Sequence, residues 1–179
     1  MNIGFDLDKV FINYPPLIPG GVIERFYKKK SNGELLYRIP KRPEQLLRNF
    51  IHHPLLRPPI KDNLAVLASI PKHEHKLYLI SSRFGFLRKR TEKLVKKYNL
   101  DTLFDGLYFN YENKQPHMFK NEVIRGLELD MYIDDDFPLL KYVAKENKKT
   151  KFYWLTNKKK QMLTKNISSI NNLSDIFPS

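Results

Sequence analysis

The stretch Asn2 to Val10, NIGFDLDKV, decides how the rest of the sequence is interpreted. Its apolar run, Ile3 to Leu7, has the length and composition of a short buried strand. Two carboxylates, Asp6 and Asp8, interrupt the end of that run. Because like charges two positions apart repel each other, the pair needs a compensating reason. The end of this first strand is therefore a candidate site.

Four more apolar runs along the chain have the same character. Helical patterns separate them, and each pattern places its apolar residues on one face. The predicted strands are Ile3 to Leu7, Leu77 to Ile80, Gly106 to Phe109, Met131 to Ile133 and Phe152 to Leu155, and the helical patterns cover 87–98, 119–127 and 139–143. This alternation predicts an α/β fold with a doubly wound, mostly parallel, five-stranded, Rossmann-like sheet. At 179 residues the chain is expected to form a single domain, 1–179.

One segment, 14–61, does not follow the alternation. It holds eight of the 12 prolines in the chain and one short helical candidate, Glu44 to Phe50. Proline lacks a backbone N–H and disrupts both helices and sheets, so little regular structure is expected. We predict a small insertion after the first strand, at a position where insertions often act as lids over a site.

The overall charge and the cysteine count limit the classes of function. Lys and Arg total 32 against 19 Asp and Glu, a net charge of +13. Such an excess favours anionic partners, although a solvated basic surface explains it equally well. The chain has no cysteine, which excludes disulfides and thiolate chemistry. No apolar stretch approaches the roughly 20 residues that span a bilayer, so we expect a soluble, cytoplasmic protein without a membrane partner.

Polar residues follow three of the five predicted strands. They are Asp6 and Asp8 after the first, Ser81, Ser82 and Arg83 after the second, and Asp134, Asp135 and Asp136 after the fourth. Ligands bind at the carboxyl ends of the strands in an open parallel sheet. Each feature alone has a simple explanation, because Asp136 and either serine could cap a following helix. Helix capping does not explain why all three coincide at strand ends.

Taken together, these residues resemble the four motifs of the haloacid dehalogenase-like (HAD) phosphohydrolases. Asp6, Asp8 and Val10 match the first motif, and Ser81 ends the strand of the second. For the lysine of the third motif, Lys120 is the best match and Lys114 the alternative. The fourth motif, an acidic pair after a strand, matches Asp134 and Asp135, and Lys9 stands where many members have glycine.

The resemblance implies a HAD-like fold in which 14–61 is a small cap. It also implies a Mg²⁺-dependent phosphatase that hydrolyses phosphate monoesters through an aspartyl-phosphate. The sequences ISSR and YIDDD look most like the deoxyribonucleotidase branch of the family, so a nucleotide is a candidate for the small phosphorylated substrate.

The roles implied by this resemblance can be assigned residue by residue. Asp6 is the expected nucleophile and a metal ligand, and Asp8 the acid and base, with its backbone carbonyl completing the metal site. Asp135 is the expected direct metal ligand. Asp134 is expected to act on the metal through a bound water, or to hydrogen-bond the groups that bind the metal directly. Ser81 and Ser82 are expected to contact substrate, and Lys120 to balance the charge of the transferred group. Arg83 either reaches substrate or lies at the surface, as an arginine that opens a helix in so basic a chain often does.

An alternative from another class stays open at this point. The charge of +13 also suits a basic nucleic-acid-binding or polynucleotide-end-processing protein on the same fold. A protein that only binds nucleic acid has no use for a paired nucleophile and acid, so the phosphatase is favoured. The oligomeric state cannot be inferred from the sequence.

Overall fold

A seven-stranded sheet forms the centre of the molecule in the computed structural model, which describes residues 1–16, 28–29, 35–158 and 161–178. The strand order is β5-β4-β1-β6-β7-β9-β8. The bounds are β1 Asn2–Phe5, β4 Lys76–Ser81, β5 Gly106–Phe109, β6 Met131–Asp134, β7 Lys151–Leu155, β8 Met162–Thr164 and β9 Ile167–Ile170. A separate two-stranded ribbon pairs β2 Lys28–Lys29 with β3 Leu36–Tyr37.

All five predicted strands are present and are paired in parallel, so the α/β doubly wound fold is confirmed. The predicted count of five is wrong, because β9 adds in parallel to β7 and β8 then pairs antiparallel to β9. In β9 the two isoleucines, Ile167 and Ile170, are buried, and two serines stand between them. That short polar interval hides the strand in a search for apolar runs.

Six helices, α2 to α7, and two short 3₁₀ turns complete the described part of the chain. The helices are α2 Arg42–Ile51, α3 Lys61–Ser69, α4 Arg88–Lys97, α5 Leu100–Leu103, α6 Pro116–Gly126 and α7 Phe137–Glu146, and the 3₁₀ turns are Gly85–Leu87 and Leu173–Asp175. The sequence does not predict α3, because its apolar residues run consecutively from Leu64 to Leu67 rather than at helical spacing. The helical candidate within the insertion is confirmed as α2. In the described residues, none of the helices combines the length and apolar character needed to cross a membrane.

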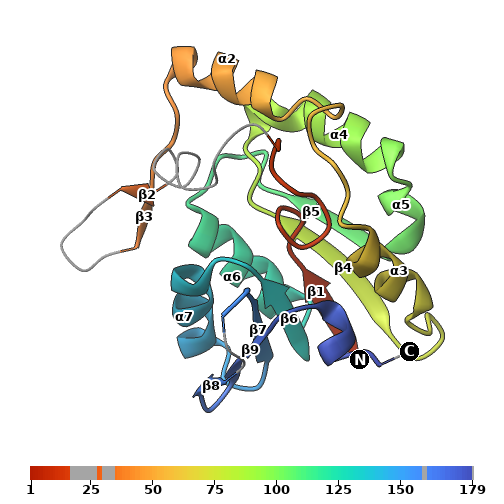
Figure 1. The fold of residues 1–179 in the computed structure, drawn as a ribbon. Helices are drawn as coiled ribbons and strands as arrows, with labels where there is room; N and C mark the ends of the chain where they lie inside the picture. Colours follow the sequence, from red (N-terminus) through yellow and green to blue (C-terminus); the bar gives the residue numbers. More distant parts are fainter. Residues whose placement is uncertain (17–27, 30–34, 159–160, 179) are drawn as a thin grey trace.

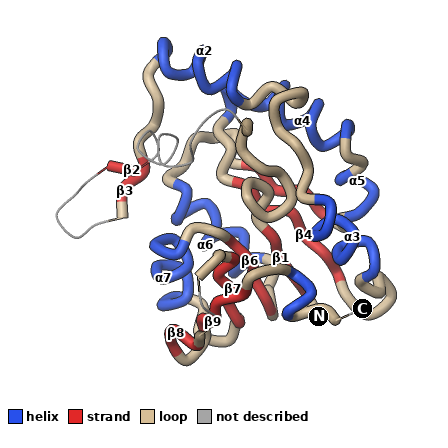
Figure 2. Tube along the Cα trace, in the orientation of Figure 1, coloured by secondary structure: helices blue, strands red, loops and turns tan. Residues whose placement is uncertain are grey.

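The helices cover both faces of the sheet, and each face has its own apolar core (Figures 1 and 2). On one face Phe5, Leu79 and Ile133 of the sheet pack with residues of α3, α4 and α5. On the other face Ile80 and Tyr132 pack with residues of α6 and α7. Strands covered on both faces read as continuous apolar runs, which is why the sequence pattern identified them.

Strand β1 lies between β4 and β6, where the chain order of the strands reverses. The loop that follows β1 is tightly folded, because the carbonyl of Leu7 accepts hydrogen bonds from the N–H groups of Phe11 (3.0 Å) and Ile12 (3.1 Å). The side chain of Asn63 also donates to the carbonyl of Val10 (2.7 Å). The fold therefore fixes Asp6 and Asp8 at the switch point, where open α/β sheets bind ligands.

The ribbon β2–β3 projects from the body, and α2 lies beside α4 at the top of Figure 1. Gln115, just before α6, holds Tyr37 of β3 by two hydrogen bonds: the Tyr37 N–H donates to its side-chain oxygen (3.0 Å) and its side-chain N–H donates to the Tyr37 carbonyl (3.2 Å). The hydroxyl of Tyr37 donates to Asp136 (2.7 Å). Part of the predicted insertion, 17–27 and 30–34, lies outside the described residues.

Candidate active site

Three carboxylates converge at the carboxyl ends of β1 and β6. Asp6 follows β1, Asp134 is the last residue of β6, and Asp135 comes next. One oxygen of each lies within 4.8 Å of the others, and we call these three residues the acidic cluster. Two of the strand ends singled out in the sequence are thus brought together, because β1 and β6 are hydrogen-bonded neighbours.

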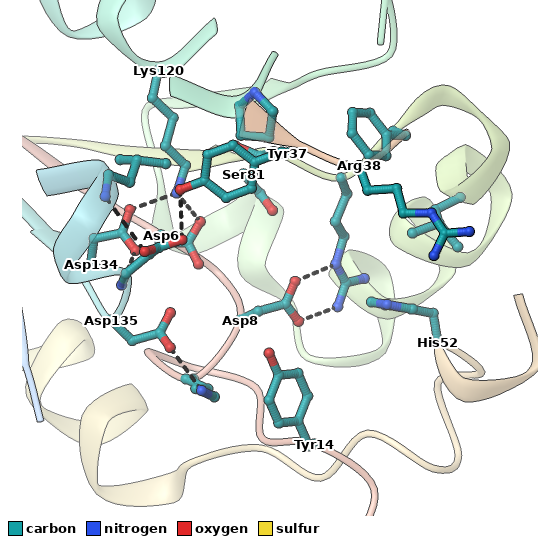
Figure 3. A pocket seen from close by; sticks show the side chains of 18 residues that line it. Asp6, Asp8, Tyr14, Tyr37, Arg38, His52, Ser81, Lys120, Asp134 and Asp135 are labelled. Carbon is teal, nitrogen blue, oxygen red and sulfur yellow. Dashed lines mark hydrogen bonds and ion pairs between the residues drawn. The ribbon is translucent and has the colours of Figure 1, made fainter. Parts of the chain in front are cut away.

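Lys120 of α6 spans the acidic cluster. Its Nζ lies 2.7 Å from Asp6 Oδ1 and 2.6 Å from Asp134 Oδ2, and its side chain is almost completely buried (Figure 3). The alternative, Lys114, lies at the surface, where it pairs with Glu122 (2.8 Å) and Glu112 (3.3 Å). Of the two candidate lysines, the structure therefore places Lys120, and not Lys114, beside the acidic cluster.

Asp134 is held from several sides. Besides Lys120, it accepts hydrogen bonds from the hydroxyl of Tyr132 (3.0 Å) and from the backbone N–H of Asp136 (2.9 Å). Asp136 itself caps α7, since its side chain accepts from the N–H of Leu139 (3.5 Å), as the sequence predicts. Asp134 is therefore oriented by its surroundings, and Asp135 is the more available of the two for a ligand.

The electrostatics of the acidic cluster are unfavourable without a counter-ion. Burial raises the pKa of Asp6 well above its usual range; Lys120 opposes this shift, and Asp134 adds to it. Burial, together with Asp134, raises the pKa of Asp135 to about 7, although Lys9 works against the shift. For Lys120, burial acts to lower the pKa, but Asp134 and Asp6 outweigh it and the pKa lies above its usual value. Such crowding of carboxylates is typical of functional sites.

Asp8 lies in a very different environment. Arg83 grips it with two hydrogen bonds, Nε to Oδ2 at 2.9 Å and Nη2 to Oδ1 at 2.7 Å. Nη2 of Arg57 forms an ion pair with the same Oδ1. We call Arg57 and Arg83 the arginine clamp; both side chains are buried, at 0% and 2% exposure. Burial acts to raise the pKa of Asp8, but Arg83 and Arg57 outweigh it and hold the pKa well below its usual range.

His52 completes the surroundings of the arginine clamp. Its Nδ1 lies 3.2 Å from Nη1 of Arg57. Because a guanidinium has only donors, this contact requires Nδ1 to be the unprotonated acceptor nitrogen. Burial and the neighbouring Arg83 and Arg57 lower the pKa of His52 well below its usual value, which agrees with a neutral ring.

Ser81 and Ser82 line the same cavity as the acidic cluster. Ser81 is the last residue of β4, and both hydroxyl oxygens are buried without a hydrogen-bond partner among the described residues. Neither serine caps a helix, since the next turn, Gly85–Leu87, has Phe84 at its N-cap position. Buried hydroxyls normally have partners, so an unsatisfied pair facing a cavity is suited to hydrogen-bonding a ligand.

Lys9 has a clear place in the structure. Its backbone φ is 60°, in the left-handed region where glycine is favoured. Its Nζ lies 3.1 Å from Asp135 Oδ2 and also lies over the ring of Tyr14. Lys9 thus supplies a cation to the acidic cluster.

Aromatic and apolar side chains also line the cavity. Besides the acidic cluster, the lining includes Tyr14, Tyr37, Phe84, Leu87 and Pro116, together with the basic residues Arg38 and His52. The guanidinium of Arg38 pairs with Glu44 (2.9 Å). The cavity therefore combines charged groups with aromatic and apolar surface.

The donors of the acidic cluster fit a hard divalent cation. Mg²⁺ prefers carboxylate oxygens and keeps several waters, and the three carboxylates each offer one oxygen at close range. In this structure two lysines offset the negative charge of the acidic cluster: half-buried Lys9 pairs with Asp135, and buried Lys120 pairs with Asp6. The residues present fit the metal that the sequence predicts.

Several residues of the site were not predicted from the sequence. Arg57, His52, Tyr37 and Tyr132 all contact predicted site residues. Arg57 stands in the proline-rich segment with no periodic pattern to single it out. Arg83 was predicted to contact substrate, and the structure places its guanidinium on Asp8, so its contact with substrate stays a prediction.

Comparison with known proteins links this geometry to a fold. No family model and no curated protein matches the sequence. Among solved structures, a HAD-superfamily hydrolase from Ehrlichia chaffeensis is similar over 97% of this chain and 92% of its own, with a TM-score of 0.57 and 13% identity. A haloacid dehalogenase-like hydrolase from Xanthomonas campestris covers 98% and 92%, with a TM-score of 0.58 and 12% identity.

A third similar structure is the D,D-heptose 1,7-bisphosphate phosphatase from B. bronchiseptica in complex with magnesium and phosphate. It matches 97% of this chain and 93% of its own, with a TM-score of 0.54 and 10% identity. At these identities the likeness establishes the fold: the chain has the fold of HAD-superfamily hydrolases. The deoxyribonucleotidase branch is not confirmed and stays a prediction.

Proposed function

We propose that this protein is a Mg²⁺-dependent phosphatase that hydrolyses phosphate monoesters through a phosphorylated Asp6. The observation that carries the proposal is the convergence of Asp6, Asp134 and Asp135, with the Nζ of Lys120 on Asp6 and Asp134. A carboxylate can attack a phosphate dianion only where positive charge offsets their repulsion. The likeness to HAD-superfamily hydrolases supports the same chemistry.

The metal would be held by carboxylate oxygens of Asp6 and Asp135 with the backbone carbonyl of Asp8, and by Asp134 through water. When bound, it supplies charge neutralisation and orientation to the phosphoryl group. Lys120 contributes further positive charge at the same place. The unpartnered hydroxyls of Ser81 and Ser82 would donate to phosphoryl oxygens.

The reaction divides into two displacements at phosphorus. In the first, an oxygen of Asp6 forms a bond to phosphorus while the bond to the leaving oxygen breaks. In the second, water attacks phosphorus, the bond to Asp6 breaks and returns its electron pair to the carboxylate, and Asp8 accepts the proton of the water. The arginine clamp keeps Asp8 in the carboxylate form that can accept this proton, and the same two arginines make it a weak base.

The acid role predicted for Asp8 in the first step is opposed by the same arginines. Esters whose leaving oxygen needs little protonation, such as aryl phosphates, should therefore react best. The aromatic side chains that line the cavity, Tyr14, Tyr37 and Phe84, support an aromatic leaving group as well. A nucleoside monophosphate has only the second feature, because its base could contact the aromatic side chains while its leaving ribose oxygen still needs a proton.

The test is phosphate release from 4-nitrophenyl phosphate and a nucleotide panel, with and without Mg²⁺. We expect Mg²⁺-dependent turnover that Asp6→Asn abolishes, because an amide cannot form the phosphorylated intermediate. Asp101→Asn, at an exposed aspartate of α5, is the matched control and should retain full activity.

Two results would count against the proposal. Turnover that survives Asp6→Asn removes Asp6 as the nucleophile. Absence of turnover on every ester, together with salt-sensitive binding of a phosphorylated oligonucleotide, would favour the nucleic-acid-binding alternative.

A further inference from the structure

Arg57 contacts both Asn13, in the segment that follows β1, and Asp8 of the candidate active site. Arg57 is not among the residues that line the cavity. Its guanidinium is fully buried, and all three of its nitrogens have partners. Nε donates to the carbonyl of Asn13 (2.7 Å), Nη1 contacts His52 (3.2 Å) and Nη2 pairs with Asp8. The hydroxyl of Tyr98 in turn donates to the Arg57 carbonyl (2.8 Å).

This arrangement fixes the position of one carboxylate. Arg83 holds Asp8 with two hydrogen bonds from a single segment of the chain, the one that follows β4. Arg57 approaches Asp8 from another segment and is anchored at its backbone by Tyr98 and at its side chain by Asn13. Two guanidiniums from separate segments therefore restrain Asp8 far more than one does.

We propose that Arg57 is a positioning residue that holds the Asp8 carboxylate where it removes the proton from the water attacking phosphorylated Asp6. This inference rests on the proposed function and adds a role for a residue outside the four motifs. In the second displacement, the oxygen of water bonds to phosphorus, the phosphorus–oxygen bond to Asp6 breaks, and the proton passes to Asp8. A misplaced Asp8 slows this step while leaving the attack by Asp6 largely intact.

The test separates the two displacements. Rapid mixing of Arg57→Ala with 4-nitrophenyl phosphate and Mg²⁺ should give a burst of nitrophenol followed by a slow steady state. Acid-quenched protein should carry more phosphate on Asp6 than the wild type does. We expect dephosphorylation to fall about 10²-fold, the lower range for loss of a general base. Added guanidinium ion should restore part of the rate.

Controls distinguish positioning from simple loss of stability. Asn63→Ala removes another buried polar anchor of the loop after β1, the one that binds the Val10 carbonyl, without reaching Asp8. It should lower the melting temperature without a burst or guanidinium rescue. Arg57→Lys keeps the positive charge and a folded site, and should show a smaller burst of the same kind.

The outcomes also separate this inference from the proposed function. A wild-type protein that never forms phosphorylated Asp6 overturns the proposed function and the inference with it. A wild type that forms it, with an Arg57→Ala that shows no accumulation or loses both steps equally, overturns only the role of Arg57. A crystal structure of Arg57→Ala with Asp8 unmoved on Arg83 would also overturn it.

Discussion

Asp6 and Asp8 stand two residues apart, yet their surroundings are opposite in charge. Asp6 shares a buried space with Asp134 and Asp135, and Lys120 is the cation nearest to it. Asp8 is held by the two guanidiniums of the arginine clamp. The site thus separates a carboxylate that shares one lysine with a second carboxylate from a carboxylate that is paired with two arginines. This difference gives each a distinct chemical task within one loop.

The largest effect should come from replacing each carboxylate by its amide and measuring urea unfolding without Mg²⁺. Asp8→Asn leaves two buried arginines without their anion and should destabilise the protein by about 3 to 5 kcal/mol. Asp6→Asn removes like-charge repulsion and should stabilise it by about 1 kcal/mol, one pKa unit being worth about that much. Shifts of the same sign in both variants would contradict the contrast between the two environments.

Mg²⁺ should stabilise the folded protein by binding at the acidic cluster. At 100 times its dissociation constant, a ligand specific for the folded state adds about 2.7 kcal/mol. The melting temperature should therefore rise with Mg²⁺ and return on adding EDTA. Asp135→Asn should lose this shift, whereas Asp101→Asn, outside the site, should keep it. A shift that survives in Asp135→Asn would place the metal elsewhere.

Lys9 should compete with the metal for Asp135. Its ammonium lies on an oxygen of that carboxylate, and its left-handed backbone is strained for any residue other than glycine. We expect Lys9→Gly to bind Mg²⁺ about 10-fold more tightly, a gain of about 1.4 kcal/mol, as measured by titration calorimetry. Lys9→Arg keeps the charge and should bind as the wild type does. If Lys9→Gly binds Mg²⁺ with the same affinity as the wild type, the ion pair between Lys9 and Asp135 does not weaken metal binding, and this prediction is wrong.

The smallest effect concerns pH and the arginine clamp. His52 has a lowered pKa in the folded state, so below about pH 6.5 the unfolded chain binds the extra proton more readily. Stability from this group is present above that pH and is lost as the pH falls, with a slope approaching about 1.4 kcal/mol per unit.

The variant His52→Gln should flatten this acid dependence, whereas His73→Gln should not, because His73 is exposed and 81% of its side chain is accessible. Urea unfolding between pH 7 and 5.5 measures the slope. An unchanged slope in His52→Gln would show that the neutral ring is not required beside Arg57.

Much of the fold was accessible from the sequence because buried parallel strands leave a direct signal. Leu77 to Ile80 and Met131 to Ile133 are apolar throughout since both faces are covered. Strand β9 escaped because two serines separate its buried isoleucines, and α3 escaped because its apolar residues do not follow a helical period. Local sequence patterns thus fail to predict an element when the burial of its residues depends on neighbours that are distant in the sequence.

The sequence by itself determined which residues could carry the chemistry: Asp6, Asp8, Ser81 and the Asp134–Asp135 pair follow strands whose carboxyl ends must meet. Only the tertiary structure decided which basic side chain forms an ion pair with which carboxylate. Lys120 rather than Lys114 enters the acidic cluster, Lys9 reaches Asp135, and Arg57 joins Arg83 on Asp8. The physical reason is that strand ends follow from local hydrophobic patterns, whereas ion pairs join residues as far apart as 114 positions and depend on how the helices and the insertion pack.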